Sequence, residues 1–227
     1  MTTGIGVFDS MLVKDSELQY GQDHYDRLIH DADTVIGAKS SLSFSDFENI
    51  IHELLKKNSL TDGFVRVRST ITGGEVNAPL AKSDTPTIFI SAAATTLPDT
   101  TTPLKCAVIT DFPRIAGCKL ENCKRLDYSR SYAARRKAEE LGAGEAILTN
   151  TEGNIACGAT SNIFIRENGK LITPPLSDGI LAGVTRKNIM KEKEVIEESI
   201  SIDRLRSADK IYLTNSFFGM REIKIVA

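Results

Sequence analysis

A stretch rich in threonine and proline, TTLPDTTTP at residues 95–103, constrains the fold more than any other feature of the sequence. It carries no apolar repeat and lies between two strand-like runs, so we expect it to be a linker. A chain of 227 residues is long enough to bury a core on each side of such a linker. We therefore predict two domains, a small α/β domain over residues 1–100 and a larger domain over residues 101–227.

The first half of the chain alternates strand and helix patterns. Residues 5–13, 64–71 and 87–94 have the period-two alternation of half-buried strands. The run DHYDRLIHDADTVIG, residues 23–37, is typical of one helix. A second helix is expected to start near Ser43, with a capping box formed by Ser45 and Glu48, and to end around Asn58.

The second half mixes strands, hairpins and helices. We predict a strand at residues 104–110, then a helix at residues 131–142 that Gly142 ends. Two hairpins follow at residues 145–157 and 162–175, each turning on a glycine. A helix begins at GVTRKNIM, residues 183–190, and KIYLTNS, residues 210–216, is expected to be the last strand. The predicted fold class is α+β with two lobes.

Composition excludes several classes of protein. A net charge of −2 gives no electrostatic reason to expect nucleic acid or membrane as a partner, and no apolar run is long enough to span a bilayer. The N-terminus lacks the pattern of a signal peptide. No CxxC pair occurs among the four cysteines, and all three histidines lie in helical patterns. We therefore expect no metal site and no disulfides, and a cytoplasmic location with reduced thiols.

Residues 124–216 carry short motifs in a fixed order. They are K-x-L-D, A-x-x-x-G-A-x-E-A, G-x-I, S-N-I-F, L-x-T-P-P-L-S-D-G-I-L-x-G-V-T-R and A-D-x-I-x-L-T-N-S. Together they resemble the class IV aminotransferase family, the fold type IV pyridoxal-phosphate enzymes. That family includes branched-chain and D-amino-acid aminotransferases and 4-amino-4-deoxychorismate lyase. The first half resembles it more loosely, through GIGVFDSMLV and HYDRL. The resemblance implies a two-domain fold type IV enzyme with pyridoxal 5′-phosphate as cofactor.

Lys124 falls at the position of the family lysine that holds the cofactor as a Schiff base. Its spacing to the motif around Gly142 and Glu145 matches without a gap. A neutral lysine can attack the cofactor aldehyde and can afterwards carry a proton at the substrate carbon. Lys119, in AGCKLEN, is the alternative, although choosing it requires an insertion of five residues before the helix.

The resemblance also implies an anchor for the cofactor phosphate. Val184 and Thr185 open the helix that begins at GVTR, where free backbone N–H groups suit a dianion. Arg27, in HYDRL, matches the family arginine that pairs with the phosphate from the first domain. Asn215 and Ser216 occupy the third phosphate-binding segment, although side chains in such a loop can also simply cap the backbone.

Two residues are expected at the cofactor ring. Tyr128 lies near the family tyrosine that contacts the phenolic oxygen, or else it packs in the core. Cys157 stands where class IV aminotransferases carry a glutamate that keeps the pyridine nitrogen protonated. A protonated thiol cannot do this, and its other interpretation is a small buried hydrophobe. The substitution favours elimination over transamination, because elimination depends less on the cofactor as an electron sink.

The resemblance therefore favours a lyase that eliminates pyruvate from 4-amino-4-deoxychorismate to give 4-aminobenzoate, a folate precursor. The ending ADKIYLTNSFFGM also resembles that of the lyases. An amino-acid aminotransferase of the same fold, acting on branched-chain or D-amino acids, and an inactive member without turnover are the alternatives. The resemblance further implies a homodimer with active sites between the two lobes.

The sequence departs from the family in three places. Near STITGGEVNAP two family arginines are missing, and Glu75 stands at the second; Arg66, Arg68 or Arg114 are candidate substitutes for anchoring a substrate carboxylate. The chain begins where family members are some 20–30 residues in, so their first strands are expected to be missing. The helix after GVTR is expected to be about eight residues shorter.

Overall fold

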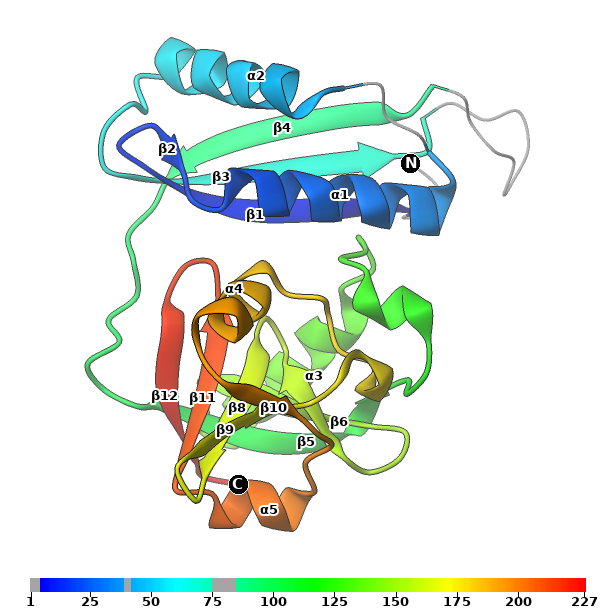
Figure 1. Ribbon diagram of the computed structural model, residues 1–227, viewed down its shortest axis with the longest axis vertical. Coiled ribbons are helices and arrows are strands. Elements are labelled where there is room, and N and C mark those ends of the chain that lie inside the picture. The colour runs from blue at the N-terminus through cyan, green and yellow to red at the C-terminus, as the bar shows by residue number, and fades with distance from the viewer. Residues whose placement is uncertain (1–4, 39–41, 75–84) are drawn as a thin grey trace. The chain divides into compact units, whose positions relative to one another are not determined.

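The computed structural model of the chain describes residues 5–38, 42–74 and 85–227. It contains two compact units (Figure 1). The first comprises Met1–Leu97 and Cys123–Asp127, and the second comprises Pro98–Asn122 and Tyr128–Ala227. The predicted division at residue 100 left Cys123–Asp127 with the second half of the chain, whereas in the structure this segment packs with the first unit. Glu75, and with it the comparison to the second family arginine, lies outside the described residues.

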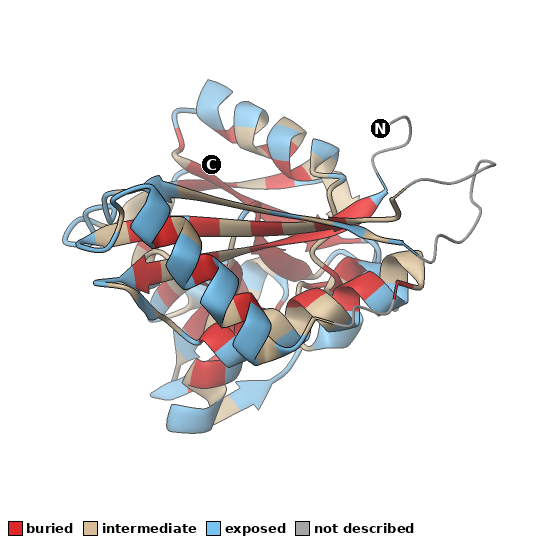
Figure 2. Cartoon of the chain, turned by 90° about the horizontal axis from the view of Figure 1, so that it is seen from above, coloured by how far each residue is buried: buried red, intermediate tan, exposed pale blue. Residues whose placement is uncertain are grey.

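The first unit is built on an antiparallel sheet with the strand order β2-β1-β3-β4. Its elements are, in chain order, β1 (Gly6–Lys14), β2 (Glu17–Leu18), α1 (Gly21–Ile36), α2 (Phe44–Lys57), β3 (Phe64–Thr72) and β4 (Thr87–Ala94). Alternate residues of β1 and β3 point into a core that they share with one face of each helix. Both helices are accordingly amphipathic, as the striping in Figure 2 shows. The strands and helices predicted for this half are confirmed, apart from shifts at their ends.

The predicted start of α2 near Ser43 is confirmed, but the predicted capping box of Ser45 and Glu48 is wrong. Ser43, and not Ser45, is the N-cap residue, because its hydroxyl accepts a hydrogen bond from the backbone N–H of Asp46 at 3.1 Å. The helix therefore begins at Phe44. Ser45 lies two residues past the N-cap, so it cannot form a capping box with Glu48, since only the first N–H groups of a helix lack partners within it.

The second unit is built on an eight-stranded mixed sheet with the order β10-β9-β8-β11-β12-β5-β6-β7. Its strands are β5 (Leu104–Arg114), β6 (Glu145–Asn150), β7 (Ile155–Gly158), β8 (Asn162–Glu167), β9 (Lys170–Thr173), β10 (Val195–Glu197), β11 (Lys210–Asn215) and β12 (Gly219–Ile225). Its helices are η1 (Lys119–Asn122), α3 (Ser129–Glu140), η2 (Leu176–Asp178), α4 (Val184–Glu192) and α5 (Ile202–Ser207). Two apolar clusters form its core. Within the described residues, no helix of the chain is long and apolar enough to cross a membrane.

The two predicted hairpins are confirmed, since β6 pairs antiparallel with β7 and β8 pairs antiparallel with β9. Gly153 and Gly169 turn them with φ of 81° and 77°, a region that glycine enters without strain. The expectation that residues 210–216 form the last strand is wrong. β12 follows and pairs antiparallel with β11. Its polar residues, Arg221, Glu222 and Lys224, obscure the apolar alternation by which a strand is identified.

Candidate active site

Lys124 lies on a short segment that lines the edge of β1. The Phe8 N–H donates a hydrogen bond to the carbonyl of Lys124 at 2.9 Å, and the Leu126 N–H donates to the carbonyl of Gly6 at 2.9 Å. Between them, Arg125 forms an antiparallel bridge with Val7. Gly6 permits this approach, because a Cβ there would lie 2.6 Å from the backbone carbonyl oxygen of Ile71 and 2.7 Å from the side chain of Leu126. The segment Cys123–Asp127 is thus held to the sheet of the first unit by backbone pairing.

The amine of Lys124 lies in a strongly charged setting. Its Nζ is 4.6 Å from the centre of the Phe8 ring. Burial, and then the nearby Arg27 guanidinium, lower the pKa of Lys124 to about 8, while Asp9 acts in the opposite direction. With a pKa of about 8, roughly one Lys124 amine in ten is neutral at pH 7. Lys124 can therefore act as a nucleophile toward a carbonyl near neutral pH.

A buried carboxylate on β1, that of Asp9, contacts the side chains of His24 and Arg27. Asp9 is 3% exposed; its Oδ1 lies 2.7 Å from Nδ1 of His24, and its Oδ2 accepts hydrogen bonds from Nε and Nη2 of Arg27 at 2.8 and 2.7 Å. Burial alone would raise the pKa of Asp9, but Arg27 and His24 outweigh it and hold the pKa at about 2. Asp9 is therefore ionised at neutral pH and fixes the orientation of the Arg27 side chain, which can pair with an anion.

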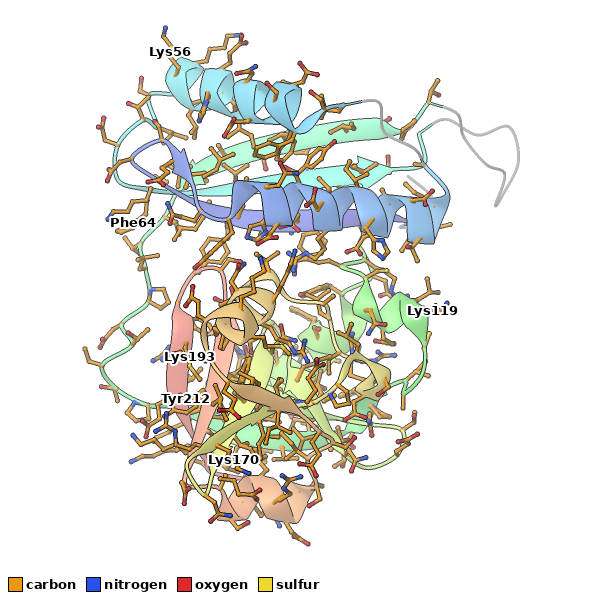
Figure 3. The ribbon with its side chains drawn as sticks, in the orientation of Figure 1. Lys56, Phe64, Lys119, Lys170, Lys193 and Tyr212 are labelled. Atoms are coloured by element: carbon orange, nitrogen blue, oxygen red, sulfur yellow. The ribbon has the colours of Figure 1, made fainter. Side chains whose placement is uncertain are left out.

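The alternative lysine lies in a different setting. Lys119 is on η1 in the second unit and is exposed (Figure 3). The amine of Lys124 has the charged neighbours Arg27 and Asp9, whereas the side chain of Lys119 is exposed. The arrangement around Lys124 is thus the one that suits a reactive amine.

A second group of candidate residues lies in the second unit, at the N-terminus of α4. Gly183 is the N-cap residue, and Val184 and Thr185 form the first turn. A Cβ on Gly183 would lie 1.9 Å from Oδ1 of Asn162, whose amide donates to the Leu181 carbonyl at 2.9 Å. The approach of this turn to β8 therefore requires glycine. N–H groups of a first helical turn have no partner within the helix, so this turn can bind a phosphate group.

Buried hydroxyls flank the turn at the end of β8. Thr214 pairs with Asn162 across β11 and β8, and α4 packs against β11. Among the described residues, no hydrogen bond reaches the hydroxyls of Thr214 or Ser161, although both are buried. A buried hydroxyl without a partner is unfavourable, so these atoms are suited to a polar ligand group. The residues present thus fit an anionic cofactor.

The remaining candidate residues differ in what they contact. Oδ1 of Asn215 accepts hydrogen bonds from the N–H groups of Phe217 and Phe218 at 2.9 and 3.1 Å, so this side chain does cap the backbone. Ser216 and Tyr128 are half-buried, and Tyr128 is the N-cap residue of α3. Cys157, on β7, is 5% exposed, and burial raises the pKa of its thiol, so it carries no negative charge at neutral pH.

Arg114 and Arg68, two of the three candidate substitutes for the missing family arginines, make different contacts. Arg114 donates from Nε to the carbonyl of Gly179 at 2.7 Å and lies 2.8 Å from the buried carboxylate of Glu121. The guanidinium of Arg68 instead lies 3.7 Å from the centre of the Phe8 ring, which Lys124 also approaches. Arg68 is thus the candidate next to Lys124.

Known proteins resemble the chain along almost its whole length. The family model described as amino-transferase class IV matches residues 6–226. A putative branched-chain-amino-acid aminotransferase from Methanocaldococcus jannaschii is 30% identical over 94% of this chain and 75% of its own length.

Solved structures are also similar. A putative 4-amino-4-deoxychorismate lyase from Legionella pneumophila has a TM-score of 0.91 and 26% identity, covering 98% of this chain and 83% of its own. An aminotransferase from Brucella abortus, solved with the cofactor PLP bound, has a TM-score of 0.86 and 25% identity, covering 99% of this chain and 82% of its own. These likenesses confirm the fold class predicted from the sequence.

Proposed function

Since the chain belongs to the class IV aminotransferase family of pyridoxal-phosphate enzymes, we propose that it is a lyase of that family. Its substrate is 4-amino-4-deoxychorismate, from which it eliminates pyruvate to give 4-aminobenzoate. In this reaction the ring loses a proton, the carbon–oxygen bond to the enolpyruvyl group breaks, and that group leaves as pyruvate. The products together contain all atoms of the substrate, so the reaction needs no second substrate.

We assign a role in cofactor binding to the candidate residues of each unit. Lys124 carries pyridoxal phosphate and then accepts the ring proton, which its lowered pKa supports. In the first unit, Arg27, held by Asp9, is proposed to bind the cofactor phosphate. In the second unit, the N–H groups of Val184 and Thr185 and the polar groups of Asn215 and Ser216 are proposed to bind it. Tyr128 is proposed to contact the phenolic oxygen. When bound, the cofactor withdraws electrons from the carbon that loses its proton.

The state of Cys157 is the observation that carries the choice of a lyase. Its thiol is buried and protonated. The sequence motifs align Cys157 with the glutamate of the family's aminotransferases. A neutral group at the pyridine nitrogen makes the cofactor a weaker electron sink. Elimination tolerates this better than transamination does, since the leaving group takes up the electron pair.

An aminotransferase is the second candidate. It is favoured by the 30% identity to the putative branched-chain-amino-acid aminotransferase, which extends over 94% of this chain. The two candidates use the same cofactor and differ in their products, so a product assay separates them.

We expect the purified chain, loaded with pyridoxal phosphate, to release 4-aminobenzoate and pyruvate in equal amounts from 4-amino-4-deoxychorismate. No amino acceptor should be required. Fluorescence of 4-aminobenzoate and a coupled pyruvate assay measure the two products. Conversion of amino acids to keto acids that depends on an acceptor would instead identify an aminotransferase. Failure to bind the cofactor would identify an inactive member.

Replacing Cys157 with glutamate tests the electron-sink argument. We expect Cys157→Glu to raise transamination by about tenfold to a hundredfold, because the carboxylate stabilises positive charge on the ring. Cys157→Ser stays neutral and should not gain transamination, so it is the matched control. The measurement is keto-acid formation from amino-acid substrates at saturating cofactor. Loss of cofactor binding in Cys157→Glu would mean that this position does not face the ring nitrogen.

A further inference from the structure

The backbone of Lys124 is held from two sides. On one side its carbonyl accepts the hydrogen bond from Phe8 of β1. On the other side its N–H donates to Oδ2 of Asp31 at 2.8 Å. Asp31 belongs to α1 and is 2% exposed. A strand and a helix of the first unit therefore both fix the peptide from which the Lys124 side chain departs.

The carboxylate of Asp31 contacts a second residue of this segment. It also forms a hydrogen bond with the thiol of Cys123, the residue before Lys124. Burial raises the pKa of Asp31, while the Lys124 N–H, Arg27 and the Cys123 thiol act in the opposite direction. A buried carboxylate on a helix is unfavourable unless hydrogen-bond donors satisfy it. The two donors to Asp31 are the Cys123 thiol and the Lys124 N–H, which belong to consecutive residues.

The charge of Asp31 also acts on the amine of Lys124. Two arginines and two carboxylates face that amine: Arg27 and Asp31 from α1, Asp9 from β1, and Arg68 from β3. The arginines lower the pKa of Lys124 and the carboxylates raise it. Asp31 itself is faced by Arg27 and His30 of α1 and by Cys123. Its carboxylate thus combines a geometric effect on the backbone of Lys124 with an electrostatic effect on its side chain.

We propose that Asp31 is the positioning residue of Lys124. Its carboxylate fastens Cys123 and Lys124 to α1 and so determines where the Lys124 amine lies among Asp9, Arg27 and Arg68. The consequence for catalysis rests on the proposed function, in which the amine must be held ready for the carbonyl of the cofactor. The positioning itself belongs to the protein without cofactor, so it is testable separately.

Amide hydrogen exchange in the full chain without cofactor tests the geometric effect. In Asp31→Ala, we expect the Lys124 amide to exchange about tenfold or more faster than in the unchanged protein, because its acceptor is lost. Asp31→Asn keeps an oxygen that can accept the same bond and should retain most of the protection. Asp33→Asn removes a charge from an exposed position of the same helix and should leave exchange unchanged. Equal protection of the Lys124 amide in Asp31→Ala would overturn the proposal.

Chemical labelling of the amine tests the electrostatic effect and does not depend on Asp31→Ala folding. Short pulses of acetic anhydride at a series of pH values, with mass spectrometry of the peptide containing Lys124, give the midpoint of its labelling. In Asp31→Asn we expect this midpoint at lower pH than in the unchanged protein and in Asp33→Asn, because a carboxylate that favours the charged amine is gone. An unchanged midpoint would overturn this half of the proposal.

A third measurement separates this proposal from the proposed function. Pyridoxal phosphate followed by borohydride reduction marks the lysine that carries the cofactor in the unchanged protein. Marking at a lysine other than Lys124 would contradict the proposed function, while the exchange and labelling results would still decide the role of Asp31. Marking at Lys124 with unchanged exchange in Asp31→Ala would overturn only the role of Asp31.

Discussion

Replacing Lys124 with alanine is expected to lower turnover by at least about a thousandfold, because the variant loses both the attachment of the cofactor and the proton acceptor. Reduction with borohydride should then leave no pyridoxal phosphate on the peptide that contains residue 124. The lowered pKa of Lys124 and its place beside Asp9 and Arg27 underlie this expectation. Product formation and peptide mass spectrometry are the two measurements.

Lys119→Ala is the matched control for Lys124→Ala. Lys119 is exposed on η1, so its loss should leave both turnover and cofactor attachment close to those of the unchanged protein. The opposite pattern, with attachment lost in Lys119→Ala and kept in Lys124→Ala, would transfer the proposed role to Lys119. Native-state hydrogen exchange of β1 in both variants excludes a loss of folding as the cause.

The hydrophobic periodicity and the short sequence motifs predicted most of the helices, strands and turns, because each of these elements depends on residues close together in the sequence. The alternation in β1 and β3, the amphipathic pattern of α1 and the glycine turns of both hairpins are local features. The attachment of Cys123–Asp127 to the first unit is not local. It depends on backbone hydrogen bonds to Gly6 and Phe8, more than a hundred residues away in the chain. Backbone bonds of this kind leave no side-chain pattern in the sequence.

The carboxylates around Lys124 were missed, although each left a signal. Asp9 occupies an inward position of β1, in the row that includes Val7, Met11 and Val13. Asp31 follows Leu28 on the buried face of α1. An acidic residue within an apolar repeat indicates a buried charge that requires partners. The sequence could not identify those partners, because α1 brings His24 and Arg27 to Asp9 only after it packs on the sheet.

In the second unit, the sequence motif identified the candidate binding residues but not the contacts around them. Val184 and Thr185 were identified from a motif, and the structure places them in the first turn of α4. The requirement for glycine at position 183 was not identified, because it arises from contact with Asn162 on a different element. The unpaired hydroxyls of Ser161 and Thr214 could not be foreseen either, since they depend on the pairing of β8 with β11.

Replacing Asp9 with alanine is expected to destabilise the first unit by about 3–5 kcal/mol, because it leaves the largely buried guanidinium of Arg27 without its carboxylate. Asp9→Asn keeps the size of the side chain and should lose mainly the stabilisation that comes from the negative charge of Asp9. The pKa of Asp9 is about 2 in the folded chain, against an ordinary value of 3.8. This difference corresponds to about 2 kcal/mol of stability. Native-state hydrogen exchange of β1 and β3 amides, with the full chain in urea, reports the stability of this unit alone.

The acid dependence of that stability gives the sharper test. Because folding lowers the pKa of Asp9, its contribution is complete above about pH 5 and is lost as the pH falls from about 4 through about 2. The unchanged protein should therefore lose about 2 kcal/mol more over this interval than Asp9→Asn does. Asp33→Asn, which removes an exposed carboxylate from α1, should follow the unchanged protein. Parallel curves for the unchanged protein and Asp9→Asn would show that Arg27 and His24 do not hold Asp9 ionised, and the orientation of Arg27 toward a phosphate would then need another cause.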